Sequence, residues 1–217
     1  MDAQQRVGAV QLSARLRGVS PQVTRRLLVS EQASLAKLHA VLQVAFDWSD
    51  EHLYTFQIRG WQFGNPSRAI ELALAGGAVD IPLAAFAFAI IETCRYQYNL
   101  FVPWEIDCRI EARGMVATSE PTCLAAQGDP PDEDLGGPAA YPEWLESTSP
   151  AWTLHQVEEL LDEGLDDEQF RVEAREILGN ARLGQPRRRA IDRRLRQLSA
   201  TDWDAGRLYE NEGSADH

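Results

Sequence analysis

The stretch LAKLHAVLQVAFDWSDEHLYTFQI, residues 35–58, changes from a helical period to a strand period and so decides the fold class. Its first half places apolar side chains on one helical face, and Ser34 before it is a suitable N-cap. The apolar helical positions are Leu35, Leu38, Leu42, Ala45 and Phe46. We predict that this helix ends near Asp47 and that Leu53–Arg59 forms a strand, with Trp48 and His52 at the junction. A helix that leads directly into a strand predicts a helix packed on a sheet.

Two-residue alternation on either side of this stretch predicts two antiparallel hairpins. The first joins Val7–Arg17 to Val23–Val29 through the turn residues Gly18–Pro21. The second joins Thr93–Leu100 to Trp104–Arg113. In the last of these runs, apolar residues from Trp104 to Ala112 alternate with charged residues from Glu105 to Arg113, so one face carries only charged side chains. This pattern is typical of an antiparallel sheet with one face in water.

The rest of the chain has weaker signals. We expect a loop with at most short elements over Trp61–Asp80, a short buried helix over Pro82–Ile91 and no regular structure over Gly114–Pro138. Pro142 is suited to open a short helix at its first turn. Further helices are predicted around 154–161, 170–183 and 187–198.

These elements predict an α+β fold with a mostly antiparallel sheet. One helix packs after the first hairpin, and the C-terminal third of the chain is helical. We divide the chain into a domain over residues 1–183 and a C-terminal segment over residues 184–217, which holds an Arg-rich helix and a frayed tail.

Composition excludes several classes of protein. The 217 residues are 44% hydrophobic and carry a formal net charge of -12, which suits a domain with a real core and disfavours general nucleic-acid binding. The longest apolar run, Ile81–Ile91, is shorter than the roughly 20 residues of a membrane span. Because the N-terminal residues also lack a signal pattern, we expect a cytoplasmic protein without membrane contact. Three widely spaced cysteines, Cys94, Cys108 and Cys123, predict buried free thiols rather than a zinc site.

Three more segments support a family resemblance. Residues 21–29 read PQVTRRLLV, residues 96–106 read YQYNLFVPWEI and residues 131–141 read PDEDLGGPAAY. Together with residues 35–58, in this order, they resemble the plasmid pRiA4b ORF-3-like family of plasmids and transposons. The family motifs are Pro-Pro-x-Trp-Arg-Arg-x-x-Val, Leu-x-x-Leu-His-x-x-Ile-Gln-x-Ala-x-Gly-Trp-x-x-x-His-Leu-x-x-Phe, Tyr-x-Tyr-Asp-Phe-Gly-Asp-x-Trp-x-His and Pro-Pro-Glu-Asp-x-Gly-Gly-x-x-Gly-Tyr. The resemblance implies an α+β fold and an association with mobile elements, and some relatives are labelled resolvase-like.

The chain departs from these motifs at polar positions. Thr24 stands where the family has Trp, residues 99–102 replace Asp-Phe-Gly-Asp, and Ile106 replaces His. Pro130 and Leu135 stand where many relatives have Cys. If relatives use that polar set for metal binding or acid–base chemistry, this chain has lost most of it, because apolar replacements neither donate protons nor ligate metals.

The remaining candidates for chemistry are His39, His52, Glu133 and Asp134. We interpret both histidines as structural, since a zinc or iron site needs more ligands at regular spacing. The acidic loop from Asp129 to Asp134 offers oxygen ligands without the EF-hand pattern, so a structured turn is favoured. We therefore predict no catalytic residue, no cofactor and no metal, with these four residues as the candidates for a metal site.

One basic cluster stands out in the acidic chain. Its members are Arg187, Arg188, Arg189, Arg193, Arg194 and Arg196. On a helix they surround an apolar stripe and suit a phosphate backbone or an acidic protein surface. The acidic run Glu158–Glu168 lies close in sequence, so we favour a contact within the chain or with a second copy over nucleic acid.

We therefore predict a non-enzymatic accessory or interaction protein of plasmid or transposon origin, which binds a protein partner or itself. Two alternatives remain open: a degenerate metal-dependent hydrolase or nuclease, and a DNA-binding accessory factor that uses the arginine cluster. A serine recombinase that uses Ser20 with Arg25 and Arg26 is disfavoured, because Ser20 stands beside a turn proline.

Overall fold

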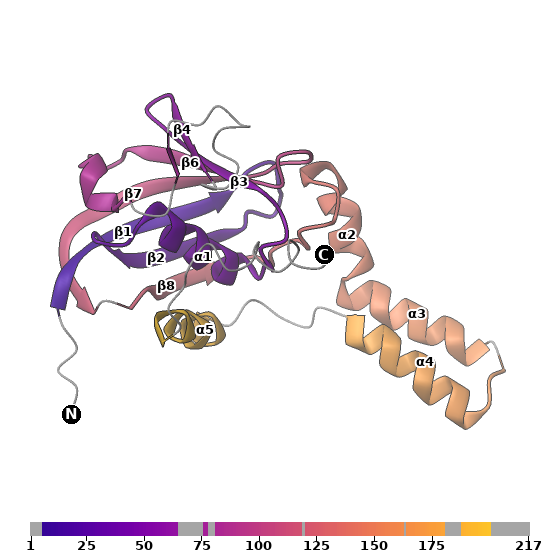
Figure 1. Cartoon of the computed structure of the whole chain (residues 1–217). Helices are drawn as coiled ribbons and strands as arrows, with labels where there is room; N and C mark the ends of the chain where they lie inside the picture. Colours follow the sequence, from indigo (N-terminus) through magenta and orange to yellow (C-terminus); the bar gives the residue numbers. More distant parts are fainter. Residues whose placement is uncertain are drawn as a thin grey trace, which may run out of the picture.

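One large sheet forms the body of the protein, and a pair of helices projects from it (Figure 1). The computed structural model describes residues 6–64, 76–77, 81–118, 120–162, 164–180 and 188–200. The strands are β1 (Arg6–Leu16), β2 (Thr24–Ser30), β3 (Tyr54–Ile58), β4 (Trp61–Gly64), β5 (Gly76–Gly77), β6 (Thr93–Tyr98), β7 (Trp104–Thr118) and β8 (Thr122–Gln127). The α-helices are α1 (Leu35–Phe46), α2 (Tyr141–Ser147), α3 (Pro150–Asp162), α4 (Asp167–Asn180) and α5 (Arg188–Ala200). The described residues also include the 3-10 turns η2 (Leu83–Phe86) and η3 (Pro138–Ala140), and the fold is α+β.

The sheet has eight strands in the order β5-β4-β3-β6-β7-β1-β2-β8. Neighbouring strands in the sheet are antiparallel, except for the short parallel pair β4 and β5. The register places Tyr54, Tyr98 and Trp104 in one row across three strands, and Phe56 beside Tyr96 in the next. All five side chains are at most 4% exposed. The sheet therefore presents an aromatic inner face, on which α1 packs.

Both ends of α1 follow from its sequence. At the start, the hydroxyl of Ser34 accepts the backbone N–H of Lys37 at 3.1 Å, as predicted for an N-cap. At the end, Asp47 adopts a left-handed conformation, with φ of 61°, and the N–H of Trp48 bonds to the carbonyl of Gln43 at 2.9 Å. This closure is the Schellman pattern of helix ends. It confirms the predicted end of the helix.

Arg25 joins the end of α1 to two strands from a fully buried position. Its guanidinium donates to the carbonyls of Ala45 at 2.7 Å, Thr24 at 2.8 Å, Gln127 at 2.8 Å and Gly128 at 3.2 Å. The carbonyl of Ala45 is one of the last four of α1, which lack donors within the helix. Burial lowers the pKa of the guanidinium to about 10. A cation at a helix C-terminus is also favoured by the helix dipole.

The predicted hairpins and the strand after α1 are confirmed, but the expectation for Gly114–Pro138 is wrong. That segment contains the end of β7 and all of β8. β8 is an edge strand of small and polar residues, so its own alternation is weak, and its pairing with β2 decides its conformation. The strand conformation of residues 122–127 thus depends on pairing with β2, which lies about a hundred residues earlier in the chain.

Two other segments differ from or extend the expectations. Pro82–Ile91 forms only the single turn η2 instead of a buried helix, and Ile90 and Ile91 are 58% and 67% exposed. Of the expected loop over Trp61–Asp80, the first residues form β4, which ends at Gly64. Residues 65–75 and 78–80 lie outside the described residues.

Helix α5 packs on β8 and α1 and contributes to the core. Ile191, Leu195 and Leu198, the stripe predicted for this helix, are at most 9% exposed. The carboxylate of Asp192 accepts the backbone N–H of Cys123 at 2.6 Å, and Lys37 donates to the carbonyl of Leu198 at 2.8 Å. The division of the chain at residue 184 stays a prediction, and the expected frayed tail from residue 205 lies outside the described residues.

The three cysteines are buried free thiols, as predicted. Cys94 and Cys108 face each other across β6 and β7. Among the described helices, none combines the length and the apolar composition needed to cross a membrane.

On the solvent side of the sheet, Glu111 accepts hydrogen bonds from Arg26 at 2.6 and 3.0 Å and from Gln11 at 2.7 Å. The Arg26 guanidinium holds the pKa of the Glu111 carboxyl below its ordinary value of 4.5. Because the folded pKa is the lower one, this stabilisation is present above the unfolded pKa and is lost as pH falls through the folded pKa. We expect Glu111→Gln to lower the free energy of unfolding by less than about 1 kcal/mol at neutral pH. Urea denaturation should show that the difference disappears in acid, and an equal difference at both pH values would contradict this account.

Candidate functional site

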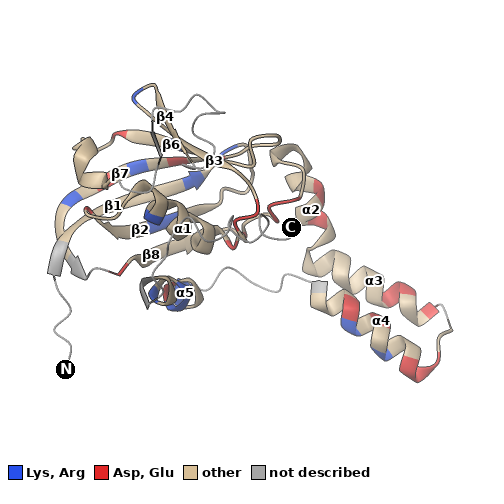
Figure 2. Ribbon diagram, viewed as in Figure 1, with Lys and Arg blue, Asp and Glu red and all other residues tan. Residues whose placement is uncertain are grey.

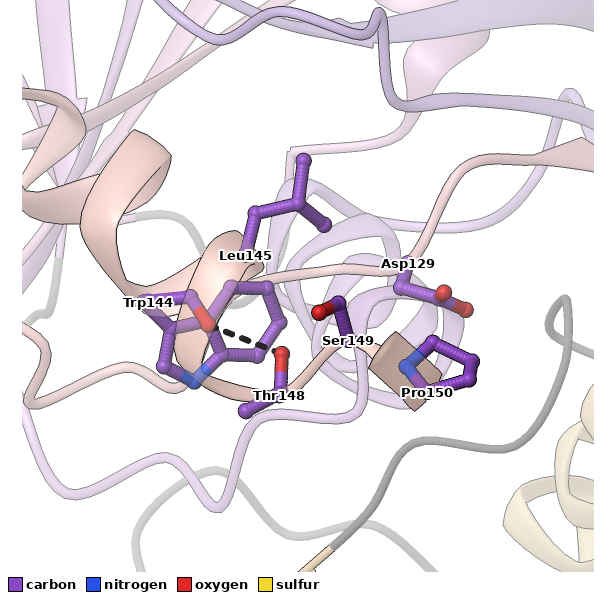
Figure 3. Close-up of a pocket in the computed structure, with 6 residues that line it drawn as sticks. All are labelled: Asp129, Trp144, Leu145, Thr148, Ser149 and Pro150. Atoms are coloured by element: carbon purple, nitrogen blue, oxygen red, sulfur yellow. Dashed lines mark hydrogen bonds between the residues drawn. The ribbon is translucent and has the colours of Figure 1, made fainter. Parts of the chain in front are cut away.

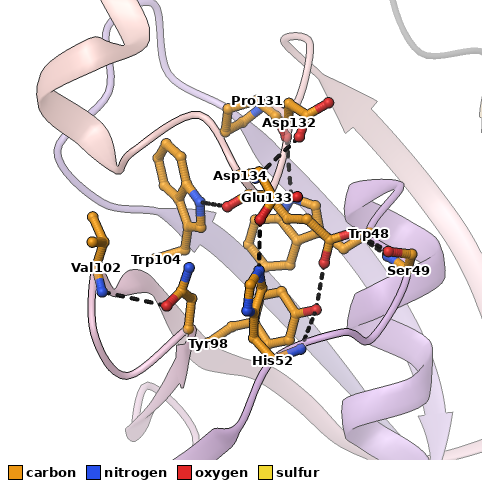
Figure 4. A network of polar contacts seen from close by, with 11 residues as sticks. Trp48, Ser49, His52, Tyr98, Val102, Trp104, Pro131, Asp132, Glu133 and Asp134 are labelled. Atoms are coloured by element: carbon orange, nitrogen blue, oxygen red, sulfur yellow. Dashed lines mark hydrogen bonds and ion pairs between the residues drawn. The ribbon is translucent and has the colours of Figure 1, made fainter.

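Residues from three parts of the chain meet where the loop after β8 crosses the end of the sheet (Figure 4). The carboxylate of Glu133 is at the centre, and the residue is 8% exposed. One of its oxygens accepts the backbone N–H of Ser49 at 2.7 Å and also the Ser49 hydroxyl. The other accepts the hydroxyl of Tyr98. Three protein donors therefore compensate the burial of this carboxylate.

Two tryptophans attach the same loop to the core. The indole N–H of Trp48 donates to the carbonyl of Pro131 at 3.0 Å, and that of Trp104 donates to the carbonyl of Glu133 at 3.0 Å. Trp48 also stacks on Tyr98, with ring centroids 5.1 Å apart. Buried indole N–H groups need acceptors, and the loop supplies both. The aromatic face of the sheet thus positions Glu133.

Tyr98 is held in its protonated form. Burial and, next, the hydrogen bond to Glu133 raise the pKa of the phenol far above its usual range. Its oxygen also accepts the backbone N–H of His52 at 3.2 Å. Tyr98 is therefore a fixed donor to Glu133, which occupies a lone pair that a general base would need.

His52 bonds to the other candidate carboxylate. Its Nε2 lies 2.8 Å from an Asp134 carboxylate oxygen, and these side chains are 26% and 65% exposed. The backbone N–H of Asp134 donates to the carboxylate of Asp132 at 3.0 Å, which is a local turn contact. This supports the predicted turn for the acidic loop. An exposed pair of this kind contributes little to stability.

His39 belongs to a separate, buried array on the inner face of α1. Its Nδ1 lies 2.7 Å from the hydroxyl of Tyr96, its Nε2 lies 2.7 Å from Asp50, and its ring stacks on Tyr54 at 3.6 Å. The side-chain amide of Gln43 donates to the Tyr96 hydroxyl at 2.8 Å. One proton order satisfies both ring nitrogens of His39: Tyr96 donates to Nδ1, and the Nε2–H donates to Asp50. Burial raises the pKa of Tyr96 well above its usual value, so the phenol stays a donor.

The structure therefore divides the four candidate residues between two networks. His52 and Asp134 bond to each other beside Glu133, whereas His39 bonds to Asp50 and Tyr96. Across the ranges that the structure describes, no three His, Cys, Asp or Glu side chains are grouped so as to hold a metal ion. A metal site made of all four would require His39 to leave both of its partners.

The positions at which the chain departs from the family motif lie in two different environments. Asn99 has a φ of 59° and its side-chain oxygen accepts the N–H of Val102 at 3.3 Å, which closes the β6–β7 turn. Phe101 at the tip of this turn is 93% exposed. Ile106, in place of the family His, is fully buried beside Tyr96. An apolar side chain there extends the core.

The arginine cluster lies along the exposed side of α5, while acidic residues gather on the projecting helices (Figure 2). Arg194 pairs with Asp47, and Arg188 lies 3.6 Å from Asp192. Arg187 lies outside the described residues. The other exposed arginines of α5 are Arg189, Arg193 and Arg196. Within the described part of the chain, these ion pairs do not use the acidic run, so binding of the cluster to nucleic acid or to a second copy stays a prediction.

A small pocket of about 150 Å³ lies between the α2–α3 turn and the start of the acidic loop (Figure 3). Its lining residues are Asp129, Trp144, Leu145, Thr148, Ser149 and Pro150. The hydroxyl of Thr148 donates to the carbonyl of Trp144 at 2.8 Å, which leaves a polar wall beside the indole. Sequence reasoning missed this pocket, because its walls come from segments that show no common pattern.

The projecting helices α3 and α4 form a hairpin, which we call the arm (residues 150–180). Asp166 begins α4: its carboxylate accepts the N–H groups of Glu168 and Gln169, each at 2.9 Å, and the Gln169 side chain accepts the N–H of Asp166 at 3.3 Å. This reciprocal pair is a capping box. Three leucines of the arm are more than half exposed: Leu154, Leu161 and Leu178. The sequence predicted these helices without showing that their leucines face solvent.

Comparison with known proteins identifies relatives of unknown function. The sequence model of the family described as plasmid pRiA4b ORF-3-like protein matches residues 8–174. The uncharacterized protein y4hQ of Sinorhizobium fredii (strain NBRC 101917 / NGR234) is 35% identical over 152 residues, which are 67% of this chain and 76% of the relative. A crystal structure of the protein of unknown function MM3350 from Methanosarcina mazei Go1 is similar, with a TM-score of 0.55 and 26% identity. The match covers 64% of this chain and 80% of that one.

Proposed function

The chain belongs to the plasmid pRiA4b ORF-3-like protein family, and we propose that it is a non-enzymatic accessory protein that binds another protein or a second copy of itself. An origin on a plasmid or transposon is part of this proposal, and the description of the family supports it. Action in the cytoplasm is also part of it, and the three free thiols fit a reducing compartment.

The engagement of the polar residues argues against the hydrolase or nuclease alternative. Glu133 accepts three hydrogen bonds from Ser49 and Tyr98, and His39 is bonded at both ring nitrogens. A catalytic base needs a free lone pair that faces a substrate. The pocket beside Asp129 contains neither histidine nor any residue of the Glu133 network.

The exposed leucines of the arm are the single observation that carries the proposal. Leu154 is 64% exposed, Leu161 is 66% exposed and Leu178 is 51% exposed. Acidic residues are frequent along both helices, so the arm combines exposed apolar side chains with charge (Figure 2). Exposed apolar side chains that cluster on one element and are bordered by polar residues mark protein interaction sites.

A pull-down from cells that carry the gene tests this proposal. We expect the tagged chain to retain a specific protein, and the variant Leu154→Ser/Leu161→Ser/Leu178→Ser to retain at least tenfold less, because each lost leucine removes about 1–2 kcal/mol of apolar burial. The measurement is quantitative mass spectrometry of the retained proteins.

The matched control is Trp61→Ser/Ile90→Ser/Phe101→Ser, which removes three exposed apolar side chains from the body of the protein. This control should retain the partner at the level of the unchanged chain. Equal losses in both variants, or turnover of a phosphoester or peptide substrate by the purified protein, would overturn the proposal.

A further inference from the structure

The arm has one seam between its two helices. On α3 the less exposed residues recur at Thr153, Val157 and Leu160, and Thr153 and Leu160 are 4% and 6% exposed. On α4 the same spacing is found at Phe170, Ala174 and Ile177. Positions i, i+4 and i+7 form one stripe along a helix. These two stripes therefore face each other inside the hairpin.

The exposed leucines lie on a second stripe on each helix. Leu154 and Leu161 each follow a seam residue of α3 by one position, and Leu178 follows the seam residue Ile177 of α4. One position along a helix is a rotation of about 100°. In antiparallel helices, rotation of the same sense away from a shared seam leads to the same side of the pair. The three leucines therefore share one face of the arm.

Charged residues complete this face in a self-complementary pattern. The stripe on α3 reads Leu154, Glu158, Leu161, and the stripe on α4 reads Arg171, Arg175, Leu178, each at i, i+4 and i+7. The structure gives these three charged side chains no ion-pair partner in the described part of the chain. A twofold axis along the arm places α3 of one copy on α4 of the other. Glu158 then faces the arginines of the second copy, and the leucines on either side of these charges lie in the same contact between the two copies.

We propose that two copies of this chain dimerise through this face of the arm and form a four-helix bundle. The inference rests on the proposed function and names the second copy as the partner. Burial of the leucines between the two copies drives the association, and the opposite charges on α3 and α4 select the pairing of α3 with α4. α3 has 13 residues and is about 20 Å long, so the interface is at the small end for specific complexes and the dimer should dissociate in the micromolar range.

Sedimentation velocity of the full-length chain over a wide concentration series tests the dimer. The mass should rise from one chain to two. Glu158→Arg should abolish dimerisation, because three cationic groups then meet at each contact, and Arg171→Glu/Arg175→Glu should abolish it through acidic repulsion. Circular dichroism checks that each variant keeps its helices, since all three positions are exposed.

A charge-exchange experiment gives the decisive test of this dimer. A mixture of Glu158→Arg with Arg171→Glu/Arg175→Glu should form a heterodimer, although neither variant associates with itself. The inference is overturned if the unchanged chain stays monomeric, if Glu158→Arg still dimerises, or if the mixture stays monomeric. A monomeric chain whose pull-down still depends on the three leucines would overturn this inference and leave the proposed function standing. A monomeric chain whose pull-down does not depend on the three leucines would overturn both this inference and the proposed function.

Discussion

Replacement of Glu133 by Ala is expected to lower the free energy of unfolding by about 3 kcal/mol. The change removes the acceptor for the N–H and the hydroxyl of Ser49 and for the hydroxyl of Tyr98. These donors lose a buried carboxylate and gain no other protein acceptor, and unsatisfied buried donors are costly. Urea denaturation followed by tryptophan fluorescence measures the loss, since Trp48 and Trp104 both contact this loop.

The neighbouring residue supplies the control. Asp134 bonds to His52, but its side chain is 65% exposed. Asp134→Ala should therefore cost less than about 1 kcal/mol. Similar losses for the two variants would show that the burial of Glu133 has no special weight in the stability of the fold.

Replacement of Arg25 by Ala is expected to have the largest effect, a loss of about 4 kcal/mol in the free energy of unfolding. Arg25 is fully buried and donates to the carbonyls of Ala45, Thr24, Gln127 and Gly128. Its removal leaves these acceptors without their donor and opens a cavity between α1, β2 and β8. Thermal and urea unfolding measure the change.

Arg26 is the matched control, because it is the same residue type on the next position of the same strand. Its side chain is 50% exposed on the solvent side, where it pairs with Glu111. Arg26→Ala should cost less than about 1 kcal/mol. If Arg26→Ala costs as much as Arg25→Ala, the role assigned to the buried guanidinium is wrong.

Local periodicity predicted the secondary structure where a segment has one buried face. In β1, Val10, Leu12, Ala14 and Leu16 were assigned to one face, and all are at most 3% exposed. In β7, Trp104, Ile106, Cys108 and Ile110 were predicted on the apolar face and are at most 2% exposed, because successive side chains of a strand point to opposite faces of the sheet.

The prediction failed where the partner of a residue is distant in sequence. β8 has no clear alternation, and its pairing with β2 and its contact with α5 make it a strand. Arg25 interrupts an otherwise apolar alternation at Val23, Leu27 and Val29. That interruption was the signal of a buried arginine, but its acceptors lie in segments up to 103 residues away.

For the candidate site, the sequence singled out four residues without indicating how the fold arranges them. His39, His52, Glu133 and Asp134 all take part in specific hydrogen bonds. Spacing along the chain did not indicate that His39 bonds to Asp50 while His52 bonds to Asp134. Tyr98 entered the sequence analysis only as part of a strand and of a family motif, although it is one of the donors to Glu133.

By itself, then, the sequence determined the α+β class, the family and the inner faces of α1 and the main strands, since apolar period is a local property that each element expresses alone. The tertiary structure decided which polar groups meet. A buried carboxylate or histidine must find its partners in three dimensions, and here those partners come from α1, the sheet and the loop after β8. The junction at residues 47–53 shows this division most clearly. Local sequence determines where the helix ends, whereas Trp48, Ser49 and His52 form hydrogen bonds with residues that are distant in sequence.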